Sequence, residues 1–203
     1  MKIICVGRNY SEHIEELENQ RPQEPVLFLK PDTAILPRKQ ELYIPDFTQN
    51  LQYEVELLVK INRVGKHIQP RFAYKYFQEI GLGIDFTARD LQQEMKEKGL
   101  PWEKAKAFDG SAVIGEFIDK DTFDSLKNIP FGLKKNESWV QRGNSAQMLW
   151  GVEELIAYIS TFFTLKTGDI IFTGTPAGVG AIASGDYLEG YIDDKKMLAV
   201  NIR

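Results

Sequence analysis

The sequence contains a single cysteine, Cys5, among its 203 residues, so no disulfide can form within the chain. A chain of this length without disulfides is typical of a reducing compartment, and we expect it in the cytoplasm. Cys5 lies in the apolar run at residues 3–6. This position favours a small core side chain over a reactive thiol.

Long hydrophobic runs are also missing, and the first residues carry no signal-peptide pattern, so we expect no membrane segment. The 25 basic and 29 acidic side chains give a net charge of −4, which offers no excess of positive charge to nucleic acid. Hydrophobic residues (43%) and charged residues (27%) occur in the proportions of a folded globular protein. No repeat, low-complexity segment or Ser/Gly/Pro-rich linker divides the chain. We therefore predict a single domain over residues 1–203.

Local patterns predict the secondary structure. Strands are expected at residues 3–7, 26–29, 51–61, 80–84, 114–118, 170–173, 187–192 and 197–202, with a hairpin over 131–140. Helices are expected at residues 12–19, 70–79, 88–98 and 152–163.

Two acidic residues, Glu54 and Glu56, interrupt the apolar strand predicted over residues 51–61. Because successive side chains of a strand alternate between its faces, both carboxylates point to the same side. Two neighbouring carboxylates repel each other unless a positive group lies between them. A hard divalent cation is one such group, since carboxylate oxygens are its preferred ligands. A solvated strand face with a lysine or arginine nearby explains the pair as well.

A third carboxylate, Asp85, follows a glycine-containing strand. Asp85 alone fits a turn, but together with the acid pair it suggests a third metal ligand. Thr87 can cap the helix that follows it. On that helix Arg89 and Gln92 are three residues apart and share a face, where both are available to a polar substrate.

Histidine is scarce, since the chain has only two. His13 and Glu16 are three residues apart on the helix predicted over 12–19, so their side chains share a face. A carboxylate can orient an imidazole and raise its basicity, as in general-base catalysis. An incidental surface contact is the alternative. His67 lies in a loop without an acidic neighbour, and we expect it to be exposed.

Two lysines and one loop are further candidates for binding an anion. Lys30 ends a strand and Lys106 lies among small apolar residues, although Lys30 fits a solvated position equally well. The glycine-rich loop 174–180 lacks the Gly-Lys-Ser/Thr ending of a phosphate loop, which excludes nucleotide binding. Its backbone N–H groups and the Thr175 hydroxyl can bind a carboxylate, although a plain turn needs no ligand.

Six motifs occur in order along the chain. They are Gly7-Arg-Asn-Tyr10 with His13 and Glu16, Phe28-Leu-Lys-Pro31, Tyr53-Glu-Val-Glu56, Asp85-Phe-Thr-Ala-Arg-Asp-Leu-Gln92, Lys98-Gly-Leu-Pro-Trp102 with Lys106 and Phe108-Asp109, and Gly168-Asp-Ile-Ile-Phe-Thr-Gly-Thr-Pro-Ala-Gly-Val-Gly180. As an ordered set, they resemble the fumarylacetoacetate hydrolase family in its short single-domain branch. That branch contains acylpyruvate hydrolases, fumarylpyruvate hydrolases, oxaloacetate decarboxylases and isomerases of homoprotocatechuate breakdown.

The resemblance implies a mainly β (α+β) fold, a rolled mixed β-sandwich with short flanking helices, and a homodimer. It implies one divalent ion, usually Mg²⁺ or Mn²⁺, with ligands at Glu54, Glu56 and Asp85. It implies that the catalytic residues are His13, Glu16 and Lys106. It implies that the substrate is bound by Lys30, Arg89, Gln92 and Thr175.

From these residues we predict a metal-dependent hydrolase that cleaves 2,4-diketo acids, such as acylpyruvates and fumarylpyruvate, to pyruvate and a carboxylic acid. The ion would stabilise an enolate at the 2-oxygen, His13 with Glu16 would activate water, and Lys106 would neutralise the developing oxyanion. The same chemistry serves an isomerase of the 2-hydroxyhepta-2,4-diene-1,7-dioate type or an oxaloacetate decarboxylase, and a fold does not choose among them. A non-catalytic binding protein is disfavoured because the ligands and the His–Glu pair are all present.

Overall fold

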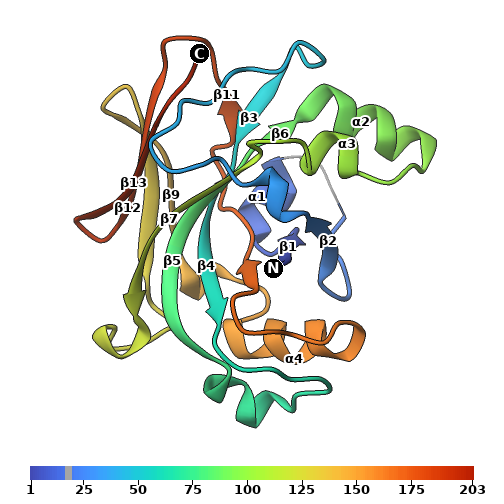
Figure 1. Ribbon diagram of the computed structural model, residues 1–203, viewed down its shortest axis with the longest axis vertical. Helices are drawn as coiled ribbons and strands as arrows, with labels where there is room; N and C mark the ends of the chain where they lie inside the picture. Colours follow the sequence, from blue (N-terminus) through green and yellow to red (C-terminus); the bar gives the residue numbers. More distant parts are fainter. Residues whose placement is uncertain (17–19) are drawn as a thin grey trace.

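In the computed structural model, which describes residues 1–16 and 20–203, the chain forms three β-sheets flanked by short helices (Figure 1). The strands are β1 (Ile3–Gly7), β2 (Val26–Lys30), β3 (Leu51–Tyr53), β4 (Val55–Ile61), β5 (Phe77–Asp85), β6 (Thr87–Ala88), β7 (Ala112–Asp119), β8 (Pro130–Lys135), β9 (Ser138–Asn144), β10 (Ile170–Phe172), β11 (Gly180–Ala181), β12 (Tyr187–Ile192) and β13 (Lys195–Asn201). The helices are α1 (Ser11–Glu16), α2 (Arg89–Lys98), α3 (Glu103–Lys106) and α4 (Val152–Phe162). The predicted mainly β architecture with short flanking helices is confirmed.

The largest sheet has the strand order β2-β1-β10-β4-β5-β7. β1 and β10 run parallel and the other neighbours antiparallel, so the sheet is mixed, as predicted. Both of its faces are buried. The adjacent residues Leu57 and Leu58 belong to two different core clusters because they point to opposite faces of β4. Cys5 is fully buried in the second cluster, which confirms it as a core residue.

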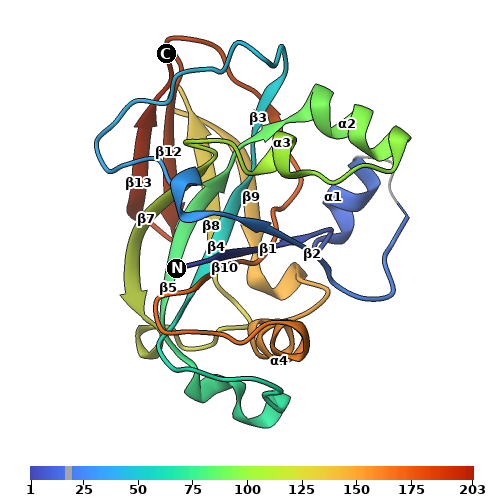
Figure 2. The same cartoon turned by 45° about the vertical axis from the view of Figure 1, so that its right-hand side comes forward.

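A four-stranded antiparallel sheet, β13-β12-β8-β9, packs against one face of the six-stranded sheet (Figures 1 and 2). Two glycines allow the sheets to approach closely. A Cβ at Gly115 would lie 2.6 Å from the carbonyl oxygen of Met197, and one at Gly190 would lie 2.7 Å from Cδ2 of Leu82. A side chain at either position would therefore push the sheets apart.

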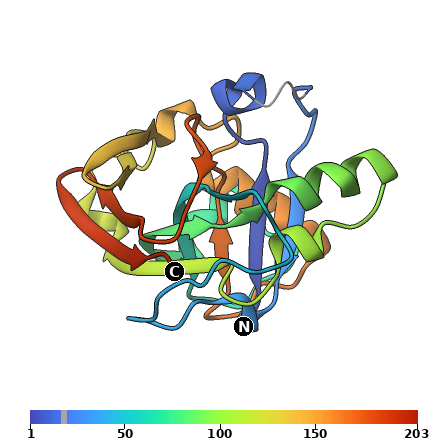
Figure 3. The same cartoon turned by 90° about the horizontal axis from the view of Figure 1, so that it is seen from above.

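Short helices cover the two ends of the sandwich. α4 packs its buried stripe of Leu155, Ile156 and Ile159 at one end, as its sequence predicts. α2 and α3 lie at the opposite end (Figures 1 and 2), and Figure 3 looks onto that end, with α1 and α2 on neighbouring sides of it. No helix among the described residues is long and apolar enough to cross a membrane.

Two predicted elements differ from the structure, and a third extends beyond its described residues. The strand predicted over 51–61 is broken at Glu54: β3 pairs in a small sheet, β11-β3-β6, while β4 joins the large one. The helix predicted over 70–79 is a 3₁₀ turn at Pro70–Lys75, because pairing with β4 holds the chain extended from Phe77 onward. The helix predicted over 12–19 is described only as far as Glu16, and residues 17–19 lie outside the described part.

Candidate active site

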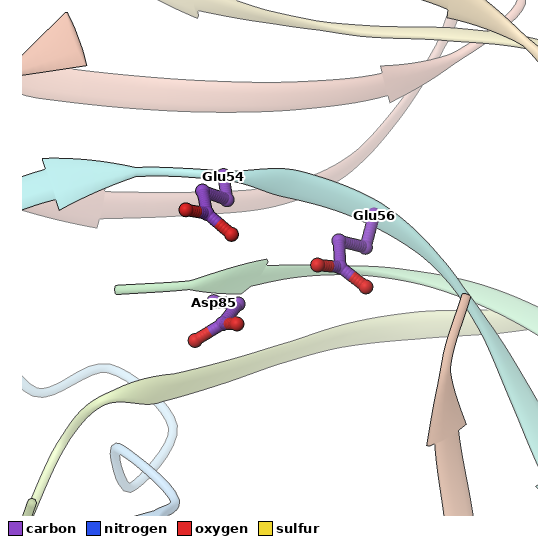
Figure 4. A group of neighbouring side chains, drawn as sticks. All are labelled: Glu54, Glu56 and Asp85. Carbon is purple, nitrogen blue, oxygen red and sulfur yellow. The ribbon is translucent and has the colours of Figure 1, made fainter. Parts of the chain in front are cut away.

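The register of the central strands brings the three predicted metal ligands together. In the antiparallel pair β4–β5, Glu56 lies opposite Gly83. The backbone N–H of Asp85 donates to the carbonyl oxygen of Glu54 over 2.8 Å. Because residues paired in this way point to one face, the three carboxylates meet there (Figure 4). A Cβ at Gly83 would lie 2.6 Å from the carbonyl oxygen of Val113 and 2.9 Å from Cδ1 of Leu58, so only glycine fits opposite Glu56.

The three carboxylates fit a divalent cation. One oxygen from each of Glu54, Glu56 and Asp85 lies within 4.8 Å of the others. Ligand oxygens about 2.1–2.5 Å from a common ion are spaced up to about 4–5 Å apart. The side chains are buried, with at most 5% of each residue exposed, so their mutual repulsion is poorly screened by water. All-oxygen donors in this arrangement suit Mg²⁺ or Mn²⁺.

Lys106 neutralises part of this cluster. Its Nζ lies 2.9 Å from Oε2 of Glu54 and 2.8 Å from Oδ2 of Asp85, and it donates to the Thr87 hydroxyl. Burial disfavours the charged ammonium, but Asp85 and Glu54 outweigh this effect and raise the pKa of Lys106. Although burial also disfavours the Glu54 carboxylate, Lys106 and Arg89 hold the pKa of Glu54 well below its usual value. Lys106 is therefore a fixed positive charge at two of the three ligands.

Lys30 and Arg89 contact the same carboxylates from other sides. Lys30 Nζ lies 2.8 Å from Oδ1 of Asp85 and is almost wholly buried, outside the lining of the cavity. Arg89 pairs with Oε1 of Glu54 and donates to Oε1 of Gln92 over 2.6 Å. Nearby lysine and arginine, the alternative to a metal, are thus present, but the face is buried and not solvated.

The glycine-rich loop binds a carboxylate of the protein itself. The N–H of Gly174 donates to Oε2 of Glu56 over 2.7 Å. Burial and the two neighbouring carboxylates raise the pKa of Glu56 well above its usual value. The Thr175 hydroxyl donates to the carbonyl oxygen of Val55 and accepts from Nε2 of Gln141, both over 2.9 Å. Thr175 lines the cavity, although its hydroxyl is already bound by protein groups.

His13 and Glu16 form the predicted contact. Nδ1 of His13 donates to Oε2 of Glu16 over 3.0 Å, and the N–H of Gly178 donates to the other oxygen, Oε1. The bond places the proton on Nδ1, so Nε2 is the basic nitrogen of His13. His13 is 7% exposed and lines the cavity. His67 is exposed in its loop, as expected.

One cavity collects most of the predicted site. The predicted residues that line it are His13, Glu54, Glu56, Asp85, Arg89, Gln92, Lys106 and Thr175. Lys30 lies behind Asp85, and Glu16 lies behind His13. Two further cations that we did not assign from the sequence, Arg8 and Lys96, also line the cavity.

Two residues that support the site were missed from the sequence. Thr87 does not cap α2, because the N-cap residue is Ala88, which makes no side-chain hydrogen bond. The hydroxyl of Thr87 instead donates to Oε1 of Glu54. Alternation from Asp85, two residues earlier in an extended chain, indicates this placement. Gln141 is buried and accepts a bond from the N–H of Val55, and no local pattern predicts such a contact.

Replacing Lys106 with methionine should destabilise the metal-free protein and make added Mg²⁺ more stabilising than it is in the wild type. Removing one partner of a buried ion pair costs about 3 kcal/mol or more, roughly 10 °C in melting temperature for a chain of this size. A divalent cation then supplies the missing charge. Thermal melts with and without Mg²⁺ measure both effects, with the exposed neighbour Lys104→Met as control. If Mg²⁺ raises the melting temperature of Lys106→Met no more than that of the wild type, Lys106 does not neutralise the carboxylate cluster.

Comparison with known proteins identifies the family. A sequence model of the fumarylacetoacetate (FAA) hydrolase C-terminal region matches residues 2–202. Oxaloacetate tautomerase YcgM of Escherichia coli is 44% identical over 92% of this chain and 86% of its own. The mitochondrial oxaloacetate tautomerase of Bos taurus is 40% identical over 94% of this chain and 86% of its own. The structure of fumarylpyruvate hydrolase from Pseudomonas aeruginosa, in complex with Mn²⁺ and pyruvate, is 37% identical, has a TM-score of 0.93 and covers 100% of this chain and 89% of its own.

All three relatives are named as enzymes, and the prediction that the chain is an enzyme of the fumarylacetoacetate hydrolase family is confirmed. Both the family match and the identities extend over nearly the whole chain. The chain therefore belongs to the fumarylacetoacetate hydrolase family.

Proposed function

We propose that this enzyme interconverts the keto and enol forms of a 2-oxo acid, with oxaloacetate as its substrate and Mg²⁺ or Mn²⁺ as its cofactor. The observation that carries the proposal is a buried cluster of three carboxylates in one cavity with His13, whose Nε2 is the basic nitrogen. The oxaloacetate tautomerases at 40% and 44% identity support the substrate. The Mn²⁺ and pyruvate in the fumarylpyruvate hydrolase complex support the metal and the 2-oxo acid class.

Tautomerisation needs one proton to move between C3 and the 2-oxygen. When bound, the metal supplies a Lewis acid that stabilises negative charge on that oxygen. His13 Nε2 takes the proton from C3, the electrons of the C–H bond form the C2–C3 double bond, and the π electrons of the carbonyl move onto the 2-oxygen. The protonated His13 then returns a proton to the 2-oxygen, which completes the enol and restores the neutral imidazole. Glu16 holds the imidazole in this tautomer and stabilises its protonated form. Lys106 adds a positive charge that favours the negatively charged intermediate.

Hydrolysis of acylpyruvates or fumarylpyruvate is the second candidate. The bond between His13 and Glu16 favours it, because a base oriented by a carboxylate can also activate water. The fumarylpyruvate hydrolase neighbour supports the same reaction. Hydrolysis breaks the C3–C4 bond, whereas tautomerisation breaks no carbon–carbon bond, so the products separate the two.

A substrate panel tests both candidates. Oxaloacetate, acetylpyruvate and fumarylpyruvate are each followed by ultraviolet absorbance of the enol and by assays for pyruvate and CO₂, with Mg²⁺ or Mn²⁺ and after treatment with EDTA. We expect metal-dependent conversion of the oxaloacetate enol without release of pyruvate or CO₂. Metal-dependent pyruvate from the diketo acids alone would replace the tautomerase with the hydrolase. Release of CO₂ at the rate of enol loss would identify a decarboxylase.

We further propose that the enzyme is a cytoplasmic homodimer. The resemblance in the sequence motifs supports the dimer, and the free, buried Cys5 suits a reducing compartment. Sedimentation equilibrium of the purified chain should give twice the monomer mass, and a monomer at micromolar concentration would refute the dimer.

A further inference from the structure

Two cations in the cavity have no part in the reaction proposed above. Arg8 and Lys96 both line the cavity, and among residues 1–16 and 20–203 neither forms an ion pair with a carboxylate. Arg89 differs, because its guanidinium is engaged by Glu54 and Gln92. The cavity therefore holds positive charge beyond what its own carboxylates neutralise.

Lys96 is held in an environment that disfavours its charge. Its Nζ lies 5.8 Å from the centre of the Trp102 ring, which also lines the cavity. Burial, together with the positive charges of Arg89 and Arg8, lowers the pKa of Lys96 to about 8. A bound anion would relieve this repulsion, and a carboxylate between a lysine and an arginine gains charge-assisted hydrogen bonds from both.

The backbone fixes Arg8 at the cavity. Arg8 has a φ of 61°, a left-handed conformation that is unfavourable for a residue with a side chain. The next residue, Asn9, holds the chain in it: its amide donates to the carbonyl oxygens of Trp150 and Thr173, and its oxygen accepts from the N–H of Trp150. Strain maintained in this way is concentrated at functional sites.

The position of Lys96 on α2 indicates the side of the carboxylate cluster on which the far end of the substrate would lie. Arg89, Gln92 and Lys96 are spaced by three and four residues, so they share the face of α2 that lines the cavity. Arg89 contacts the metal-ligand cluster, and Lys96 begins about 10 Å further along the helix axis. Because helical side chains lean toward the N-terminus, the Lys96 ammonium reaches back toward the cluster.

We propose that Arg8 and Lys96 form a subsite that binds the distal carboxylate of a 2-oxo dicarboxylic acid, so that the enzyme selects dicarboxylates over monocarboxylates. The subsite rests on the proposed function, since the carboxylate and 2-oxygen at the other end of the substrate occupy the metal centre. Lys96 and Arg8 are specificity residues and take no part in the proton transfer.

The test compares Lys96→Met with Lys98→Met on two substrates. Methionine keeps the apolar stem over Trp102 and removes the charge, while Lys98 is an exposed control on the same helix that pairs with Glu94. The substrates are oxaloacetate and its 4-methyl ester, which lacks the distal charge. We expect Lys96→Met to lower kcat/KM for oxaloacetate tenfold to a hundredfold, mainly through KM, and to change the ester less than threefold. Lys98→Met should change neither substrate.

A binding measurement separates failure of the subsite from failure of the proposed function. Calorimetry with Mg²⁺ should give the wild type at least tenfold tighter binding of oxaloacetate than of pyruvate, and Lys96→Met should abolish the difference. Arg8→Asn, which tolerates a positive φ, should reduce it as well. If oxaloacetate binds in this way but is not turned over, the subsite stands and the tautomerase fails. If oxaloacetate is turned over but both variants bind and react like the wild type, the subsite fails.

The pH profile is a third readout. The charged groups near Lys96 are Arg89 on its own helix and Arg8, Glu54 and Lys106 from neighbouring elements. Because the pKa of Lys96 is lowered to about 8, its charge is present below that pH and lost above it. The KM for oxaloacetate should therefore rise several-fold between pH 7 and 9 in the wild type, and stay flat for the ester and for Lys96→Met. A rise that persists in Lys96→Met would assign the effect to another group and overturn the subsite.

Discussion

Replacing Asp85 with asparagine should lower metal-dependent turnover by at least about a thousandfold, because Asp85 is one of the three carboxylates that we propose hold the ion, and our proposed reaction depends on that ion. Asparagine has nearly the same volume as aspartate, so the packing at the end of β5 is kept. Lys30 and Lys106, which both contact Asp85, would then face an amide, and the site would gain positive charge that repels a divalent cation. The Kd for Mn²⁺, measured by calorimetry, should rise together with the loss of activity.

Asp169→Asn is the matched control for this prediction. Asp169 is also buried, pairs with Lys2 and accepts a hydrogen bond from the N–H of Lys166, and it does not line the cavity. Its replacement should cost stability without changing the affinity for Mn²⁺ or the kcat of the folded protein. Thermal melts of both variants show how much of each effect comes from folding. If Asp85→Asn keeps more than a tenth of wild-type activity after EDTA treatment and return of Mg²⁺, Asp85 is not a ligand.

The acid pair could be predicted from the sequence, although the break at Glu54 in the strand that carries it could not. Alternation acts over two residues, so Glu54 and Glu56 share a face even though the chain changes sheets at Glu54. The side of Asp85 depends instead on the register of β4 with β5, a pairing between residues about thirty positions apart. From the sequence, Asp85 was a candidate ligand only when it was considered together with the acid pair and the motif resemblance.

Long-range pairing also explains what was missed. The helix predicted over 70–79 had suitable apolar spacing, but pairing between β4 and β5 from Phe77 onward outweighs it. Thr87 looked like a helix cap because alternation from Asp85 applies only if the chain stays extended, and it is the long-range pairing of β6 with β3 that keeps it so. By contrast, the C-terminus of α2 at Gly99, whose φ is 63°, depends on one residue and was predicted correctly.

Replacing His13 with glutamine should lower kcat by about a hundredfold to ten-thousandfold, the usual contribution of a general base, with little change in KM or in the affinity for Mn²⁺. Glutamine can still donate to Glu16 but cannot accept a proton at neutral pH. Glu16→Gln should lower kcat less, by roughly tenfold to a hundredfold, because the imidazole is still present as the base and loses only the charged partner that orients it. His67→Gln, in an exposed loop, is the control and should behave like the wild type.

The same His13→Gln variant distinguishes the roles of His13 in the two candidate reactions. If His13 moves the C3 proton, the rate of oxaloacetate tautomerisation falls by the full hundredfold to ten-thousandfold expected above. If its task is to activate water, hydrolysis of a diketo acid falls and tautomerisation does not, because tautomerisation consumes no water. Equal losses in both would mean that one nitrogen, Nε2, serves as the base for whichever proton lies nearest in the cavity. Unchanged rates in both would remove His13 from the chemistry, and its bond to Glu16 and the bond from Gly178 would then only hold α1 in place.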